Sequence, residues 1–259
     1  MEATQKAAPL FRSEVFSMKG PSVTAAVTTP GRNFYLVQPV VNYADRLRRM
    51  EEFSGPTGLS AAEFEDRAEG LFTKLRGDIL LAPTAAGVCL PVPFAARKVG
   101  DYGTDLEAVL LGTGRAYENE FPQRKFINHR KGTLASQVTV LSNTRHDRFI
   151  ARLVEPVVGL YFPNLLQGFS VDAQRQQICD LPESMLLSGP IDTALAMTAY
   201  PDVLARDFNT PGLDCSAVQW RSARCSLFFW AIGGELGFDY GTDLGIANDF
   251  YSGGVLFLG

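Results

Sequence analysis

Prolines interrupt many of the apolar stretches of this chain, and this pattern restricts how its strands can pair. Pro83, Pro91 and Pro93 break the segment 78–94. Because a proline has no N–H to donate to a neighbouring strand, it favours an edge position or a bend. We therefore expect 87–94 to lie at a sheet edge or to bend. The longest apolar runs, such as 227–232, are far too short to cross a bilayer.

One helix is predicted from its ends as well as from its middle. Ser60 and Glu63 form a capping-box pattern, and Leu59 is placed to pack against Phe64. Apolar residues then recur at helical spacing up to Gly77, where the helix is expected to end. The pattern predicts a helix over 61–76.

The remaining segments predict an α+β fold that is mixed and β-rich, with several short helices and a mainly antiparallel sheet. We expect a single domain over residues 1–259 with an N-terminal arm, and the alternative is a subdivision near 142–148. Helices are expected at 45–53, 170–180 (capped by Ser170), 190–200 (with Pro190 in the first turn) and 201–208. Strands are expected at 33–43, 78–81, 87–94, 107–111, 134–141, 157–162, 224–232 and 255–258, and 148–154 fits either a helix or a strand.

Composition narrows the function classes. The 259 residues are 46% hydrophobic and 20% charged, which is typical of a folded domain. The net charge of −4 disfavours a protein whose whole surface attracts nucleic acid through positive charge. The four cysteines form no CxxC pair and there are only two histidines, which argues against a zinc site. We predict no cofactor. The first residues lack the apolar core of a secretory signal, so we expect an intracellular or cytoplasmic protein, or a subunit of an assembled particle.

The hexapeptide DYGTDL occurs twice, at 101–106 and 239–244. A glycine between turn-forming residues favours a turn motif used twice. The alternative is a metal site for Mg²⁺ or Ca²⁺, if the two copies meet in space. Its ligands would be Asp101, Asp105, Asp239 and Asp243. The repeat also leaves open the alternative that the chain is pseudo-duplicated.

Residues 123–152 are basic in an otherwise acidic chain, with seven Lys and Arg against one acid, and they hold both histidines. We favour a solvated face or a face that docks on an acidic neighbouring subunit. The alternative is a strip that contacts RNA phosphates, with phenylalanines for stacking. The candidate contacts are Arg124, Lys125, Arg130, Lys131, Arg145 and Arg148.

The glycine-rich segment 245–255 distantly resembles the C-terminal glycine-rich loop of the CRISPR-associated repeat-processing RNA endonucleases. That resemblance implies RNA binding. Ala247 and Val255 stand where the family has glycine, and no Lys or Arg lies between them. We therefore favour a β-turn between two short strands.

Three function classes follow from these patterns. The chain has no P-loop, no GxSxG, no HExxH and no kinase motif, which disfavours an enzyme. We rank first a non-enzymatic structural subunit of a large multi-subunit assembly, such as a viral or phage particle, with other protein subunits as partners and no membrane. An RNA-binding or RNA-processing subunit comes second. A divalent-metal-dependent enzyme using the paired Asp loops comes third.

Overall fold

The computed structural model describes residues 27–28, 36–207 and 209–259. Its helices are α1 (Tyr43–Ser54), α2 (Ala61–Gly77), α3 (Tyr102–Glu120), α4 (His146–Arg152), α5 (Val171–Asp180), α6 (Pro190–Ala199) and α7 (Pro201–Leu204), with 3-10 turns η1 (Ala82–Ala86) and η2 (Ser142–Thr144). Its strands are β1 (Leu90–Phe94), β2 (Lys125–Asn128), β3 (Val138–Val140), β4 (Val157–Gln167), β5 (Met185–Leu187), β6 (Gly212–Cys215), β7 (Val218–Trp220), β8 (Ser226–Ile232), β9 (Glu235–Gly241) and β10 (Tyr251–Phe257).

Eight of the described strands form one sheet in the order β1-β4-β10-β6-β8-β9-β2, with β5 also paired to β10. Two pairings, β10 with β6 and β2 with β9, are parallel, and the others are antiparallel. The α+β class with a mainly antiparallel sheet is therefore confirmed. β1 and β2 precede the proposed 142–148 boundary, yet they share this sheet with strands that follow it. The short strands β3 and β7 form a separate pair.

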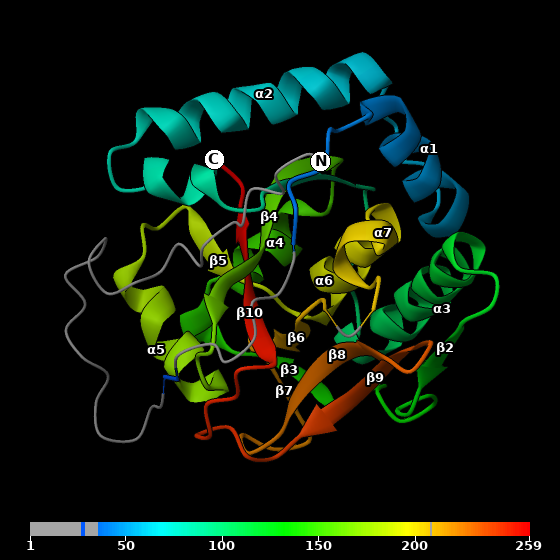
Figure 1. The fold of residues 1–259 in the computed structure, drawn as a ribbon, viewed down its shortest axis with the longest axis vertical. Helices are drawn as coiled ribbons and strands as arrows, with labels where there is room; N and C mark the ends of the chain where they lie inside the picture. Colours follow the sequence, from blue (N-terminus) through cyan, green and yellow to red (C-terminus); the bar gives the residue numbers. More distant parts are fainter. Residues whose placement is uncertain (1–26, 29–35, 208) are drawn as a thin grey trace, which may run out of the picture.

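Helices cover the two faces of the sheet unequally (Figure 1). One buried cluster joins residues of α1, α3 and α6 to inward-facing residues of most strands, including those of β8 and β9. The second joins α2 and α5 to the opposite faces of β4, β5 and β10. Alternation along β4 supplies both clusters, because Tyr161 points into the first and Leu160 into the second.

The predictions made from helix ends are confirmed. The backbone N–H of Glu63 donates to Ser60 Oγ at 3.2 Å, and Glu63 Oε2 accepts from the backbone N–H of Ser60 at 2.8 Å. Leu59 and Phe64 are buried in the same cluster. Ser170 caps α5, and Pro190 occupies the first turn of α6.

The edge position predicted from the prolines is also confirmed. β1 lies at one end of the sheet, and its Pro91 and Pro93 stand opposite Leu160 and Val158 of β4. A missing N–H is tolerated there because the outer edge of β1 faces no further strand of the sheet.

Several strand predictions were wrong. The run 107–111 lies inside α3, because Asp101 caps a helix and Leu106, Val109 and Leu110 fall on its buried face. Residues 78–81 form turns after α2. The segment 148–154, for which a helix and a strand were both left open, falls mostly in the helix α4. In 33–43, the described residues 36–42 form no strand, and Gln38 instead bonds the backbone of Cys89 through its side-chain amide.

Three further observations concern the N-terminal arm, the cysteines and the lengths of the helices. Most of the expected N-terminal arm lies outside the described residues. All four cysteines are free thiols. Among the described helices, none combines the length and the apolar character that crossing a membrane requires.

Candidate functional site

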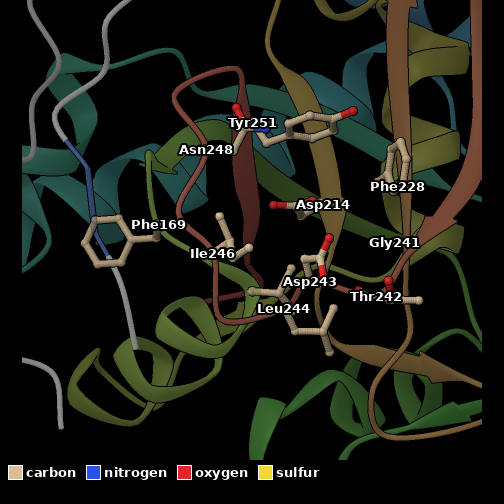
Figure 2. Close-up of a pocket in the computed structure, with 12 residues that line it drawn as sticks. Phe169, Asp214, Phe228, Gly241, Thr242, Asp243, Leu244, Ile246, Asn248 and Tyr251 are labelled. Carbon is tan, nitrogen blue, oxygen red and sulfur yellow. The ribbon is translucent and has the colours of Figure 1, made fainter. Parts of the chain in front are cut away.

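A pocket forms on the sheet face that α2 and α5 cover, at the point where this helical cover ends. α5 packs beside β6, where Gln174 bonds Asp214, and next to it β6 and β8 face the loop 242–250. The resulting cavity of about 260 Å³ is shown in Figure 2. It is lined by Phe169, Val171, Asp214, Ser226, Phe228, Gly241, Thr242, Asp243, Leu244, Ile246, Asn248 and Tyr251.

Asp214 is the most constrained polar group of the pocket. It lies on β6 between Leu213 and Cys215, which point into the opposite core. Its Oδ2 accepts a hydrogen bond from Gln174 Nε2 at 2.9 Å, and the same amide nitrogen donates to the carbonyl of Phe169 at 2.9 Å. The carboxyl group is therefore held in one position by α5.

Burial raises the pKa of Asp214 to about 7, although the hydrogen bond from Gln174 and the charge of Arg175 act in the opposite direction. The carboxyl group thus changes charge close to neutral pH. It can offer a negative charge to a ligand that brings a positive one, and it is neutral in acid.

Aromatic rings form the walls beside this carboxyl group. Phe228 and Tyr251 meet edge to face, with ring centroids 5.3 Å apart and an interplanar angle of 89°. Gly212 makes room for the tyrosine, because a Cβ there would lie 2.5 Å from Tyr251 Cε1. Burial raises the pKa of Tyr251 to about 12, so its phenol stays neutral at physiological pH.

The mouth of the pocket carries polar residues from the loop after β9. Asp243 and Asn248 are exposed there, and Figure 2 shows the carboxyl groups of Asp243 and Asp214 directed toward the same space. Two carboxyl groups beside aromatic rings suit a ligand with a positive charge and a flat or apolar body.

The two DYGTDL copies have different structures and separate roles. In the first copy Asp101 caps α3, accepting from the N–H of Thr104 at 2.8 Å and of Ser136 at 3.0 Å, and Asp105 accepts from Gly100 N–H at 2.8 Å. The prediction of a turn was therefore wrong for this copy. In the second copy Asp239 lies within β9 and forms an ion pair with Arg130 (2.8 Å), and Asp243 lines the pocket.

The acids of the two copies therefore make different contacts, and Asp243 alone among the four lines the described pocket. Within the described ranges, no three His, Cys, Asp or Glu side chains gather into a group that could hold a metal ion.

The basic residues of 123–152 are largely engaged within the chain. Arg145 is buried and donates to the carbonyls of Leu181, Pro182 and Met185 at 3.0, 2.8 and 3.1 Å. Arg148 pairs with Glu183 at 2.6 Å.

The other candidates of this segment lie closer to the surface. Arg124 lies over the ring of Phe121 and bonds the carbonyl of Arg206, and Arg130 pairs with Asp239. Lys125 and Lys131 are exposed. The segment is thus not one free basic strip.

A second polar cluster lies in the core on the opposite side of β6. Tyr102 Oη and His146 Nε2 are 2.9 Å apart, and His146 Nδ1 lies 3.9 Å from Asp192 Oδ1. Burial lowers the pKa of His146 to about 3 and raises that of Asp192 to about 7. All three side chains are buried, so this cluster offers no open binding surface.

Sequence reasoning found Asp243 and missed Asp214, Phe228 and Tyr251. The signal that it overlooked is the single acid in the apolar run 212–218, where alternation puts Asp214 on the face opposite its neighbours. Comparisons with known protein families, with curated proteins and with solved structures found no match to this chain.

Proposed function

We propose that this protein is a non-enzymatic binding subunit whose pocket receives an arginine side chain from a partner protein. The observation that carries the proposal is the carboxyl group of Asp214, fixed by Gln174 at the base of a cavity walled by Phe228 and Tyr251.

A cation is the ligand that this chemistry favours. An ionised carboxylate that is removed from bulk water is costly unless an opposite charge approaches it, and the aromatic faces attract the same cation. Asp243 adds a second carboxyl group at the mouth.

Arginine fits the pocket better than lysine does. Its planar guanidinium donates two parallel hydrogen bonds to one carboxylate and stacks on aromatic rings. Lysine is a compact, strongly hydrated charge that would lose more hydration beside Phe228 and Tyr251.

The size of the cavity supports a side chain as the occupant. Pockets for drug-sized ligands typically measure roughly 300–1,000 Å³, whereas this cavity measures about 260 Å³. One long side chain that projects from another protein suits this space.

The proposal places the chain among the assembly subunits that its sequence favoured. The RNA alternative has less support, because the buried guanidinium of Arg145 and the paired one of Arg148 already have partners within the chain. The metal alternative also has less support, because the acids of the first DYGTDL copy bind backbone groups of their own neighbourhood.

The test is calorimetric titration of the whole chain with N-acetyl-arginine methylamide and with N-acetyl-citrulline methylamide. Citrulline has almost the same shape but no charge. We expect the arginine probe to bind about tenfold or more tightly than the citrulline probe, since a hydrogen-bonded charge pair is worth about 1.5–3 kcal/mol.

The matched variant is Asp214→Asn, which keeps an oxygen that can accept from Gln174 and removes the charge. It should lose the preference for arginine over citrulline. Equal affinities of the two probes for the unaltered protein, or no binding of the arginine probe at millimolar concentration, would reject the proposal.

A further inference from the structure

We propose that the partner is a second copy of this chain, and that Arg224 of each copy enters the Asp214 pocket of the other. This inference rests on the proposed function and adds the identity of the partner. Two copies related by a two-fold axis would exchange two equal contacts, because each surface is self-complementary.

Arg224 is an exposed arginine without a partner in its own chain. Its side chain makes no hydrogen bond, ion pair or ring contact in the part of the chain that the structure describes. Every other exposed arginine of the described ranges bonds a carbonyl, pairs with an acid or lies over a ring, as Arg148, Arg152 and Arg221 do. The guanidinium of Arg224 can therefore bind a carboxylate of another molecule without first breaking a contact of its own.

A turn with a fixed backbone presents this arginine. The N–H of Cys225 donates to the carbonyl of Ser222 at 3.1 Å, which makes Arg224 a central residue of the turn. At the base of the turn, the N–H of Trp220 donates to the carbonyl of Cys225 at 3.1 Å, and the indole of Trp220 is buried. The turn is thus tied to the core, which lowers the entropy cost of binding through its tip.

The turn lies beside the pocket of the same chain. Ser226 lines the pocket and follows Arg224 by two residues, so their Cα atoms are at most about 7 Å apart. Ser226 stands opposite Gly241 of β9, which also lines the pocket. The arginine and the acidic pocket therefore occupy one region of the surface. A two-fold contact needs this arrangement, because the same patch of each copy must hold both halves of the contact.

Arg224 does not fill the pocket of its own chain. Within the described residues, no ion pair joins it to Asp214 or Asp243, and the positive charge that acts on Asp214 is that of Arg175. The carboxyl group of Asp214 bonds only the neutral amide of Gln174 among the described side chains. A guanidinium that completes this site therefore comes from a second molecule.

Apolar side chains beside the pocket favour a protein surface over a small free cation. Ile246 lines the pocket and is 66% exposed, and Phe250 of the same loop is 43% exposed. A second copy that inserts Arg224 would cover these side chains, whereas a small cation would leave them in water. Apolar area of this kind commonly surrounds the charged contacts of a protein interface.

The test is the molar mass of the whole chain, measured by light scattering from micromolar to millimolar concentration in a mildly alkaline, low-salt buffer. We expect the mass to rise toward that of a dimer. Arg224→Gln and Asp214→Asn should each weaken the dimer about tenfold or more for each of the contacts that they remove, as loss of a charged hydrogen bond predicts. Arg221→Gln is the matched control, since it removes an exposed arginine of the same loop that lies over Trp220, and it should leave the dimer unchanged.

A mixture of the two variants separates direct pairing from an effect on folding. Arg224→Gln keeps the acidic pocket and Asp214→Asn keeps the arginine, so a mixed dimer regains one of the two contacts. We expect the mixture to associate about tenfold more tightly than either variant alone. No gain on mixing overturns the inference. If a variant fails to fold, the unaltered chain still gives a test: N-acetyl-arginine methylamide should dissociate the dimer and the citrulline probe should not.

The outcomes separate this inference from the proposed function. If the chain stays monomeric at the highest concentration and still prefers the arginine probe to the citrulline probe, the pocket proposal stands and the two-copy inference is overturned. If a dimer forms but persists in Arg224→Gln and in excess arginine probe, the copies meet at another surface and the inference is likewise overturned.

Discussion

The hydroxyl of Tyr102 lies 2.9 Å from Nε2 of His146, and both side chains are buried. Tyr102 belongs to the first DYGTDL copy, which begins α3. The corresponding Tyr240 of the second copy is partly exposed on β9, below the guanidinium of Arg130. The same six residues therefore supply a core contact in one place and a surface contact in the other.

The glycines of the two copies should respond in opposite ways to alanine. A Cβ at Gly103 would lie 1.8 Å from the carbonyl oxygen of Leu134, whereas a Cβ at Gly241 would lie 3.5 Å from Phe228 Cε1. Gly103→Ala should lower the free energy of unfolding by about 3 kcal/mol or more, because backbone atoms must move. Gly241→Ala should change it by less than about 0.5 kcal/mol.

Urea denaturation of the two variants checks this expectation. In an open helix, alanine would stabilise relative to glycine by about 0.5–1 kcal/mol. A stabilised Gly103→Ala variant would therefore show that α3 does not approach Leu134 as closely as the structure has it.

The buried imidazole of His146 should make the fold sensitive to acid. Its pKa falls from about 6.5 in the unfolded chain to about 3 in the fold, because burial disfavours the charged ring. The unfolded chain thus binds the proton first, so the contribution of His146 is fully present above pH 6.5 and is lost as the pH falls toward 3. Between pH 7 and 5 the loss amounts to about 2 kcal/mol.

Denaturation of His146→Gln at pH 7 and at pH 5 measures this contribution. The variant should lose about 2 kcal/mol less on acidification than the unaltered chain does. His129→Gln serves as the comparison, since it removes the chain's other histidine from an exposed position. Identical acid responses in His146→Gln and in the unaltered chain would contradict a buried neutral imidazole.

Asp214 should act on stability in the opposite pH direction. Its pKa rises from about 3.9 in the unfolded chain to about 7 in the fold. Its contribution is therefore present below pH 4 and is lost as the pH rises through 7. Asp214→Asn should remove a loss of about 2.6 kcal/mol between pH 5 and 8, as measured by denaturation at both values.

The same titration should control ligand binding. The arginine probe should bind about tenfold more tightly at pH 8 than at pH 6, since the ionised fraction of a carboxyl group with a pKa near 7 rises by about that factor. Affinity that is constant over this range would indicate that Asp214 does not hold the cation.

The sequence predicted those elements whose ends are set by neighbouring residues. Ser60 and Glu63 satisfy the free N–H groups of α2 without help from elsewhere in the chain, and Ser170 does the same for α5. Pro91 and Pro93 exclude a central strand position because neither has an N–H to donate, which is also a local property of the chain.

The candidate site could not be predicted in the same way. Asp214, Phe228 and Tyr251 lie on strands that neighbour one another only through the order β10-β6-β8. The sequence favoured a surface position for Arg145, whereas in the fold its guanidinium donates to the carbonyls of Leu181 and Pro182.

What the sequence by itself determined is the α+β class, the start of the capped helices and the edge position of β1, because each depends on hydrogen bonds and sterics within a few residues. The tertiary structure decided the rest. It placed one DYGTDL copy in a helix and the other at the end of a strand, because Asp101 meets the N–H of Ser136 while Asp239 meets Arg130. Contacts between residues distant in the chain thus outweighed identical local preferences.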